Sequence, residues 1–162
     1  MPEEASAEQL ETIQKIMKGE RTCMITTINA EGALHSHPMT TQEAQFDGNC
    51  WFIMSQKSGT SANVEANPQV NVAYAGGSSW LSLAGTAQIV RDQAKKKELW
   101  NTFTESWFTD GAEDPDVVLL HVETTSAQYW DSPGKAVTMV SMLKAKITGD
   151  TPSAGESDTV QL

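Results

Sequence analysis

The stretch Trp51–Thr60, WFIMSQKSGT, joins a short apolar strand to a polar turn and to the first residues of a helix. Cys50–Met54 is short and apolar, as buried strands are, and Ser58 is a typical N-cap for a helix that runs to Ala66. The first N–H groups of a helix have no partner inside it, so with hydroxyls and one lysine they can hold a phosphate. A capped turn with a solvated Lys57 is the alternative interpretation.

Short β-rich segments flank this stretch on both sides. Turns rich in Gly, Asn, Asp and Pro separate the predicted strands, which are Thr22–Ile28, Ala33–Thr41, Cys50–Met54, Gln69–Tyr74, Trp80–Val90 and Asp116–Trp130. Because most connections are short, antiparallel pairing is favoured over a parallel sheet with crossover helices. We therefore expect a mainly β (α+β) fold, a six- to seven-stranded antiparallel barrel with peripheral helices.

Helices are predicted where apolar residues recur at helical spacing after a capping residue. The first is expected to follow Ser6. A second begins after Asp92, with Lys95–Lys97 on its solvent side and Phe103 on its apolar side. A third is expected at Lys135–Ile147.

The size of the chain, 162 residues, predicts one domain. We place that domain at residues 1–149 and expect residues 150–162 to form a loose acidic tail, because they contain few apolar side chains. Removal of the residues after Asp150 should then leave the fold intact.

The charge of the chain limits its partners. It has 11 Lys and Arg against 21 Asp and Glu, and no Lys or Arg lies between Lys97 and Lys135. Such a surface repels phosphate backbones and anionic lipids, so we expect neither nucleic acid nor membrane as a partner. No apolar run approaches the roughly 20 residues of a membrane span, and the N-terminus lacks a signal-peptide pattern. A cytoplasmic location is therefore expected.

Few residues are candidates for chemistry. His35 and His37 are two positions apart on a predicted strand and so share one face. Hydrogen-bonded strand histidines are favoured over a metal site, which would need a third ligand that the spacing does not supply, so no metal is expected. Cys23 and Cys50 lie within apolar strands and are expected to pack rather than to act as nucleophiles. No catalytic residue can be named.

A series of short motifs follows one another along the chain. They are Ser36–Thr40, Trp51–Ser55 with Ser58, Asn67–Val70 with Tyr74, Trp107-Phe108, Asp114–Asp116, Tyr129–Pro133, and Lys144–Lys146 with Thr148-Gly149. Their order and spacing resemble the pyridoxamine-phosphate-oxidase-like flavoproteins, and within them the general stress protein branch. The resemblance covers Leu10 to Gly149. It implies a split β-barrel that binds FMN at the interface of a homodimer.

The resemblance also implies which residues surround the flavin. Along the ring it places Ser36, His37, Pro38, Met39 and Thr40, and on the adjacent strand Phe52, Ile53, Met54 and Ser55. Towards the ribityl phosphate it places Gln56, Lys57, Ser58 and Thr60, and from the partner subunit or at the dimer contact Trp107 and Trp130. His37, Gln56 and Thr60 stand where the family often has Arg, Arg and Lys, and Met54 where it often has Thr. Each lost charge-assisted bond weakens FMN binding by about 1.5–3 kcal/mol.

Three functions are compatible with the sequence. The first is an FMN-binding general stress protein that acts as a flavin-dependent oxidoreductase on a small acceptor. The second is a flavin-binding or flavin-buffering stress protein without efficient turnover, and the third is a flavin-free dimeric barrel with a protein partner. Oxidation of pyridoxamine phosphate is disfavoured, because that substrate carries a second phosphate and the chain offers few cations to hold it.

Overall fold

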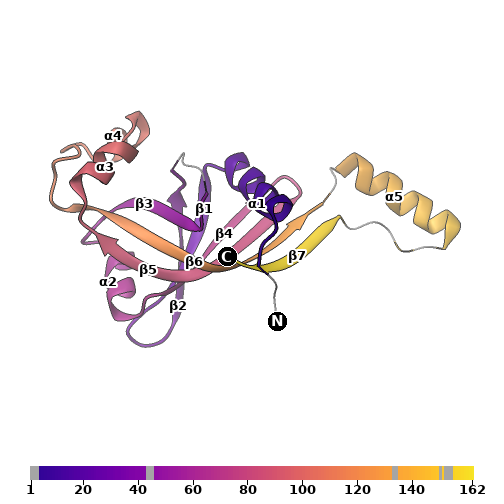
Figure 1. Ribbon diagram of the computed structural model, residues 1–162, viewed down its shortest axis with the longest axis horizontal. Helices are drawn as coiled ribbons and strands as arrows, with labels where there is room; N and C mark the ends of the chain where they lie inside the picture. Colours follow the sequence, from indigo (N-terminus) through magenta and orange to yellow (C-terminus); the bar gives the residue numbers. More distant parts are fainter. Residues whose placement is uncertain (1–3, 43–45, 133–134, 150, 152–154) are drawn as a thin grey trace.

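The body of the molecule is a seven-stranded antiparallel sheet with helices around it (Figure 1). The computed structural model describes residues 4–42, 46–132, 135–149, 151 and 155–162. Its strands are β1 (Thr22–Ile28), β2 (Leu34–Thr40), β3 (Asn49–Ser55), β4 (Gln69–Gly76), β5 (Ser79–Val90), β6 (Val117–Asp131) and β7 (Glu156–Gln161). Its helices are α1 (Ala7–Gly19), α2 (Gly59–Ala66), α3 (Gln93–Leu99), α4 (Thr102–Trp107) and α5 (Lys135–Thr148). The predicted mainly β, antiparallel fold is confirmed.

The strand order is β2-β1-β4-β5-β6-β3, and β7 adds to β6. Strand β6 is the longest, and one of its edges pairs with β5 along nearly its whole length. Its other edge is divided, because residues 117–123 pair with β3 and residues 126–131 pair with β7. The two ends of the path, β2 and β3, also contact each other, so the sheet curls towards a barrel.

A β-bulge marks the division of β6. The register with β5 shifts between Ala84, which pairs with Ser126, and Gly85, which pairs with Thr124. A Cβ on Gly85 would lie 2.3 Å from the carbonyl oxygen of Glu123, so no larger residue fits without a backbone shift. The bulge on the long strand, expected from its sequence, turns its second half onto a new neighbour.

Two helices close the core on one side of the sheet. The capping box of Ser6 and Gln9 begins α1, which buries Ile13 and Ile16 and packs on β4, β5 and β6. Ser58 begins α2, whose buried Val64 joins the same core. The largest fully buried side chains are Tyr74, Tyr129 and Phe52.

The helical region after Asp92 differs from the prediction. One helix was expected, but α3 ends at its C-cap Trp100 and Asn101 caps a separate α4, which leaves Phe103 exposed. Lys96 was expected in solvent, yet it is only 6% exposed. Its ammonium group donates to the carbonyl oxygens of Asp114 (3.1 Å) and Val117 (2.8 Å), so it ties α3 to the start of β6.

The expected loose tail is wrong for Glu156–Gln161, which form β7 on the edge of β6. Val160 is 2% exposed and belongs to the core, and Leu162 donates its N–H to the carbonyl oxygen of Thr125. One buried valine and a free sheet edge are therefore enough to order a segment of low overall hydrophobicity. Residues 150 and 152–154 of that expected tail lie outside the described residues.

We predict that Val160→Ala lowers the free energy of unfolding by about 1.5 kcal/mol or more, because two methyl groups leave a closed core. Truncation of the chain before Glu156 should lower the free energy of unfolding further, because it removes all of β7. Urea unfolding followed by tryptophan fluorescence measures both. Thr159→Ala, at an exposed neighbouring position, serves as the control and should change stability little. Equal stability of wild type and truncated chain would show that β7 does not contribute to the core.

Candidate functional site

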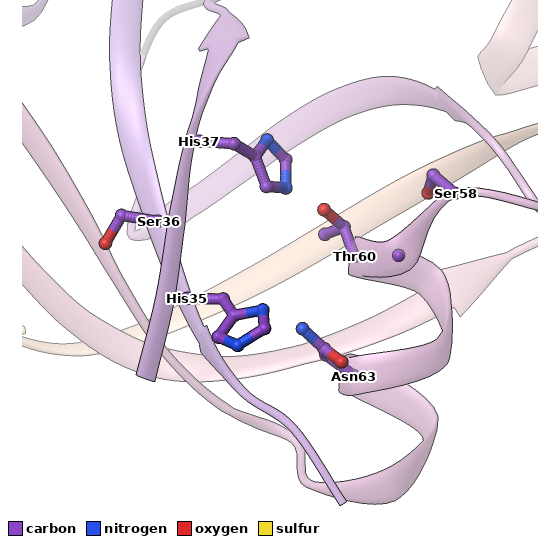
Figure 2. Close-up of a pocket in the computed structure, with 7 residues that line it drawn as sticks. His35, Ser36, His37, Ser58, Thr60 and Asn63 are labelled. Carbon is purple, nitrogen blue, oxygen red and sulfur yellow. The ribbon is translucent and has the colours of Figure 1, made fainter. Parts of the chain in front are cut away.

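A cavity of about 550 Å³ lies between β2 and the beginning of α2 (Figure 2). The residues that line it come from these two elements alone: His35, Ser36, His37, Ser58, Gly59, Thr60 and Asn63. None of these side chains is a carboxylate, although the chain carries a formal charge of −10. The pocket is therefore a place where an anion meets no direct repulsion.

Strand alternation directs the histidines into this pocket. His35 pairs with Thr27 and His37 with Ile25, both of which are fully buried, so the two imidazoles lie on the inner side of β2. Strand β2 is at one end of the strand order, and the inner side that carries the two histidines faces the beginning of α2 across the cavity. Figure 2 shows both rings directed towards the helix, whereas Ser36 points the other way.

The beginning of α2 supplies donors. The Ser58 hydroxyl oxygen accepts from the N–H of Ser61 (3.2 Å), which leaves the preceding amides of Gly59 and Thr60 without an acceptor inside the helix. The partial positive charge of a helix N-terminus adds to these donors. No acidic residue occupies the first turn, so nothing in that turn competes for the amides.

His37 has one nitrogen without a partner. Its Nδ1 lies 3.3 Å from the carbonyl oxygen of Pro38, which can only accept, so Nδ1 carries a proton. Its Nε2 is buried and has no hydrogen-bond partner among the described residues, and the same is true of the Ser61 hydroxyl. Neutral His37 thus presents a lone pair to the pocket, and protonated His37 presents a donor.

The polar turn before α2, Ser55–Ser58, is fixed by hydrogen bonds to Asp116, just before β6. The Ser55 hydroxyl donates to the Asp116 carboxylate at 2.7 Å, and the N–H of Gln56 donates to the carbonyl oxygen of Asp116 at 2.8 Å. The N–H of Lys57 donates to the Ser55 hydroxyl oxygen, while its side chain is exposed. Ser55, Gln56 and Lys57 therefore position α2 but do not line the cavity.

The other residues that the resemblance assigned to the flavin lie apart from the cavity. Phe52 and Met54 are buried in the core, and the Ser58 hydroxyl contacts the Met54 sulfur. Met39 packs against that core. The remaining ones stand on partly or fully exposed surfaces: Pro38, Thr40, Ile53, Trp107 and Trp130. Of the predicted set, the cavity unites Ser36, His37, Ser58 and Thr60.

Three lining residues were not assigned to the site from the sequence: His35, Gly59 and Asn63. The i, i+2 spacing of His35 and His37 already placed both on one face, and Asn63 follows Thr60 at helical spacing. Asn63 donates to the Thr27 hydroxyl at 3.0 Å, and His35 contacts Asn29 at 3.3 Å. The missing signal was the packing of α2 on β1 and β5, which brings its beginning opposite β2.

The cysteines do not contribute a reactive group. Burial raises the pKa of the Cys23 thiol to about 11 and that of the Cys50 thiol to about 12, so both are protonated near neutral pH. Burial also raises the pKa of the Tyr74 hydroxyl. Within the described residues, no three His, Cys, Asp or Glu side chains gather as metal ligands, and no helix is both long and apolar enough to cross a bilayer.

Comparison with known proteins identifies the family. The model of a family described as pyridoxamine 5'-phosphate oxidase like matches residues 8–153. The chain belongs to this family. The match includes β1 to β6 together with the cavity between β2 and α2.

Individual relatives agree with this assignment. The crystal structure of a candidate general stress protein 26 from Jannaschia sp. superposes with a TM-score of 0.81 at 25% identity, over 97% of this chain and 100% of that one. A general stress FMN/FAD binding protein from Xanthomonas citri gives a TM-score of 0.69 at 27% identity, over 79% and 93% of the two chains. General stress protein 26 of Bacillus subtilis is 30% identical over 74 residues, which is 43% of this chain and 52% of that one. The split-barrel fold is thereby confirmed.

Proposed function

We propose that the chain is an FMN-binding general stress protein and that its cavity between β2 and α2 holds the ribityl phosphate. The observation that carries the proposal is the pairing of two free helix-start amides with an unpartnered buried imidazole nitrogen, in a pocket without carboxylates. A phosphate matches these groups in charge and in its need for several donors. The relative from Xanthomonas citri, described as FMN/FAD binding, supports a flavin as the ligand that carries the phosphate.

FMN is favoured over a dinucleotide by the same pocket. A cavity of about 550 Å³ lined by seven residues offers one cluster of phosphate donors, and the sequence lacks both common glycine-rich dinucleotide and nucleotide loops. The Gly59 and Thr60 amides, the Thr60 hydroxyl and the His37 imidazole take the place of the Arg and Lys side chains that the family often uses. When bound, FMN supplies redox chemistry, and the protein supplies position and surroundings.

The chain's own residues support binding more than a particular reaction. His35 and His37 are the lining side chains of the type most often used for general acid–base catalysis. A flavin-dependent oxidoreductase that acts on a small acceptor is the second candidate, and the imidazole pair on one face of β2 is the observation that favours it. Steady-state oxidation of NAD(P)H by the FMN-loaded protein separates the two functions.

We also propose a homodimer, which would form through the outer face of the sheet. Strand register identifies the side chains on one part of this face, which we call the open face, and none of them is charged: Leu34, Ser36, Pro38, Thr40, Thr22, Met24, Thr26, Ile28, Gln69, Asn71, Ala73, Ala75, Trp80, Ser82, Ala84, Ser126, Gln128, Trp130, Ser157, Thr159 and Gln161. On the other side of the bulge the outer face continues through Thr86 to Glu123, which lies at the border of the open face. In so acidic a chain, an uncharged face with exposed Met24, Trp80 and Trp130 fits a subunit interface. Ser36 belongs to both this face and the cavity, so a second copy there would cover the rim of the flavin site.

We predict that His37→Gln weakens FMN binding by about ten- to hundred-fold, the value of one charge-assisted hydrogen bond. The variant keeps a polar side chain on β2 but removes the imidazole Nε2 that has no partner among the described residues. Titration with FMN, followed by quenching of flavin fluorescence, measures both constants.

His121→Gln is the matched control, because His121 lies outside the cavity and contacts Asn49 and Gln88. It should leave the FMN constant unchanged. An identical constant for wild type and His37→Gln would place the phosphate elsewhere.

We predict that Met24→Lys converts the dimer into a monomer. Met24 lies on the open face and is 41% exposed in the single chain, so a lysine there leaves the fold intact but must lose its solvation in the dimer. Sedimentation velocity measures the change. Ala66→Lys, on the exposed end of α2, should stay dimeric. A dimer of unchanged stability in Met24→Lys would exclude the open face as the interface.

A further inference from the structure

Helix α5 presents an apolar surface that its own chain does not cover. Met139, Val140, Leu143 and Ile147 recur at helical spacing and are 58–85% exposed, and Met142 beside them is 56% exposed. Figure 1 shows α5 beyond the end of the sheet, away from the other helices. It is nevertheless inserted between two paired strands, since Asp131 at the end of β6 pairs with Glu156 at the start of β7. Helix α5 is therefore held at both ends by paired strands, and its apolar side chains are exposed to solvent in the described part of the chain.

A second uncovered apolar surface lies on α4. Phe103 is 46% and Trp107 is 71% exposed, and their rings contact each other at a centroid distance of 6.2 Å. In Figure 1, α3 and α4 stand at one end of the long axis of the molecule and α5 stands at the other. The two surfaces cannot meet within one chain, because the whole sheet lies between them.

The two surfaces carry opposite charge. Helix α5 exposes Lys144 and Lys146, and its sequence contains no acidic residue. No Lys or Arg occurs between Lys97 and Lys135, and α4 carries Glu105 with Asp110 after it. The lysines of the neighbouring α3 are engaged, because Lys95 pairs with Glu98, Lys97 pairs with Glu113, and Lys96 donates to backbone carbonyls. Both surfaces are thus apolar at the centre and complementary at the rim, which is the anatomy of a specific protein interface.

Two-fold symmetry determines which surfaces can meet. In a dimer through the open face, the axis can run along the long direction of the molecule or across it. An axis along that direction would bring α5 near its own copy and α4 near its own copy, so that like charges face each other. An axis across it would bring α5 of each subunit to the α4 end of the other, where charges are opposite and both contacts form together. The charges therefore select the crossed arrangement.

We propose that α5 of one subunit docks on α4 of a second copy, with the apolar stripe of α5 against Phe103 and Trp107, and with Lys146 near Glu105. The inference rests on the homodimer of the proposed function and adds its orientation. In this arrangement, α5 of each subunit covers the exposed rings of Phe103 and Trp107 on the other subunit. It also covers two exposed apolar surfaces that a solvated monomer would otherwise leave in water.

Cross-linking tests this contact in the full chain. The double variant Glu105→Cys/Lys146→Cys is treated with a short bismaleimide, and chains are separated under denaturing conditions. Cys23 and Cys50 can stay in place, because burial and raised thiol pKa values keep them unreactive. The matched control is Glu31→Cys/Lys146→Cys, with the first thiol at the exposed β1–β2 turn. We expect a covalent dimer in the first variant and single chains in the control.

A mixture of the two single variants, Glu105→Cys and Lys146→Cys, should give the same covalent dimer, which establishes that the link joins different chains. Single chains from the first variant, in a sample that sediments as a dimer, would overturn the α5–α4 contact and leave the homodimer standing. A wild-type chain that sediments as a monomer would overturn both. Flotation of the chain with anionic vesicles through α5 would overturn the α5–α4 contact alone. FMN titration of the same samples reports separately on the cavity.

Discussion

The close approach of Gly85 to the backbone of Glu123 is the constraint on which the rest of the structure depends. It permits the bulge that lets β6 serve two neighbours on one edge, with β3 before the bulge and β7 after it. At one end, β3 leads into the turn that Asp116 fixes and so places the start of α2 beside β2. At the other end, β6 and β7 hold α5 beyond the sheet. The proposed flavin site and helix α5 thus lie at opposite ends of one bent strand, β6.

The cavity shows how an acidic chain can present a site for an anion. Strand alternation turns His35 and His37 inward, and the edge position of β2 leaves that side open to α2. The helix then adds amides that no residue of its first turn engages. Such backbone donors do not depend on basic side chains, so the absence of the family's usual Arg and Lys changes how a phosphate is held without removing the means to hold it.

Much of the fold could be predicted from the sequence, because its strands are bounded by turn residues and its helices by Ser6, Ser58 and Asp92. The errors share a physical cause. Lys96 was assigned to solvent by residue type, but two backbone carbonyls satisfy its ammonium group inside the fold. Residues 156–161 lacked a hydrophobic pattern, but the free edge of β6 ordered them. Local composition indicates neither the carbonyl acceptors that a distant segment supplies nor the free strand edge that a segment can join.

The candidate site was predicted in part. The strand–turn–helix motif indicated a phosphate near α2, and the structure places a cavity there that includes Ser58 and Thr60. Lys57 drew attention as an isolated cation, yet its side chain points to solvent. His35 lines the cavity because α2 packs on β1 and β5 and so faces β2, a long-range arrangement that spacing alone does not specify. The resemblance places Trp107 and Trp130 near the flavin of the partner subunit or at the dimer contact, and for both residues this stays a prediction.

The most direct measurement compares FMN with riboflavin, which carries the same ring and ribityl chain without the phosphate. If the amides of α2 and the His37 imidazole hold the phosphate, FMN should bind at least about tenfold more tightly than riboflavin, with one FMN per subunit at saturation. The preference should decline in His37→Gln. Equal affinity for the two flavins would contradict the account, because it would mean that the cavity between β2 and α2 does not recognise the phosphate.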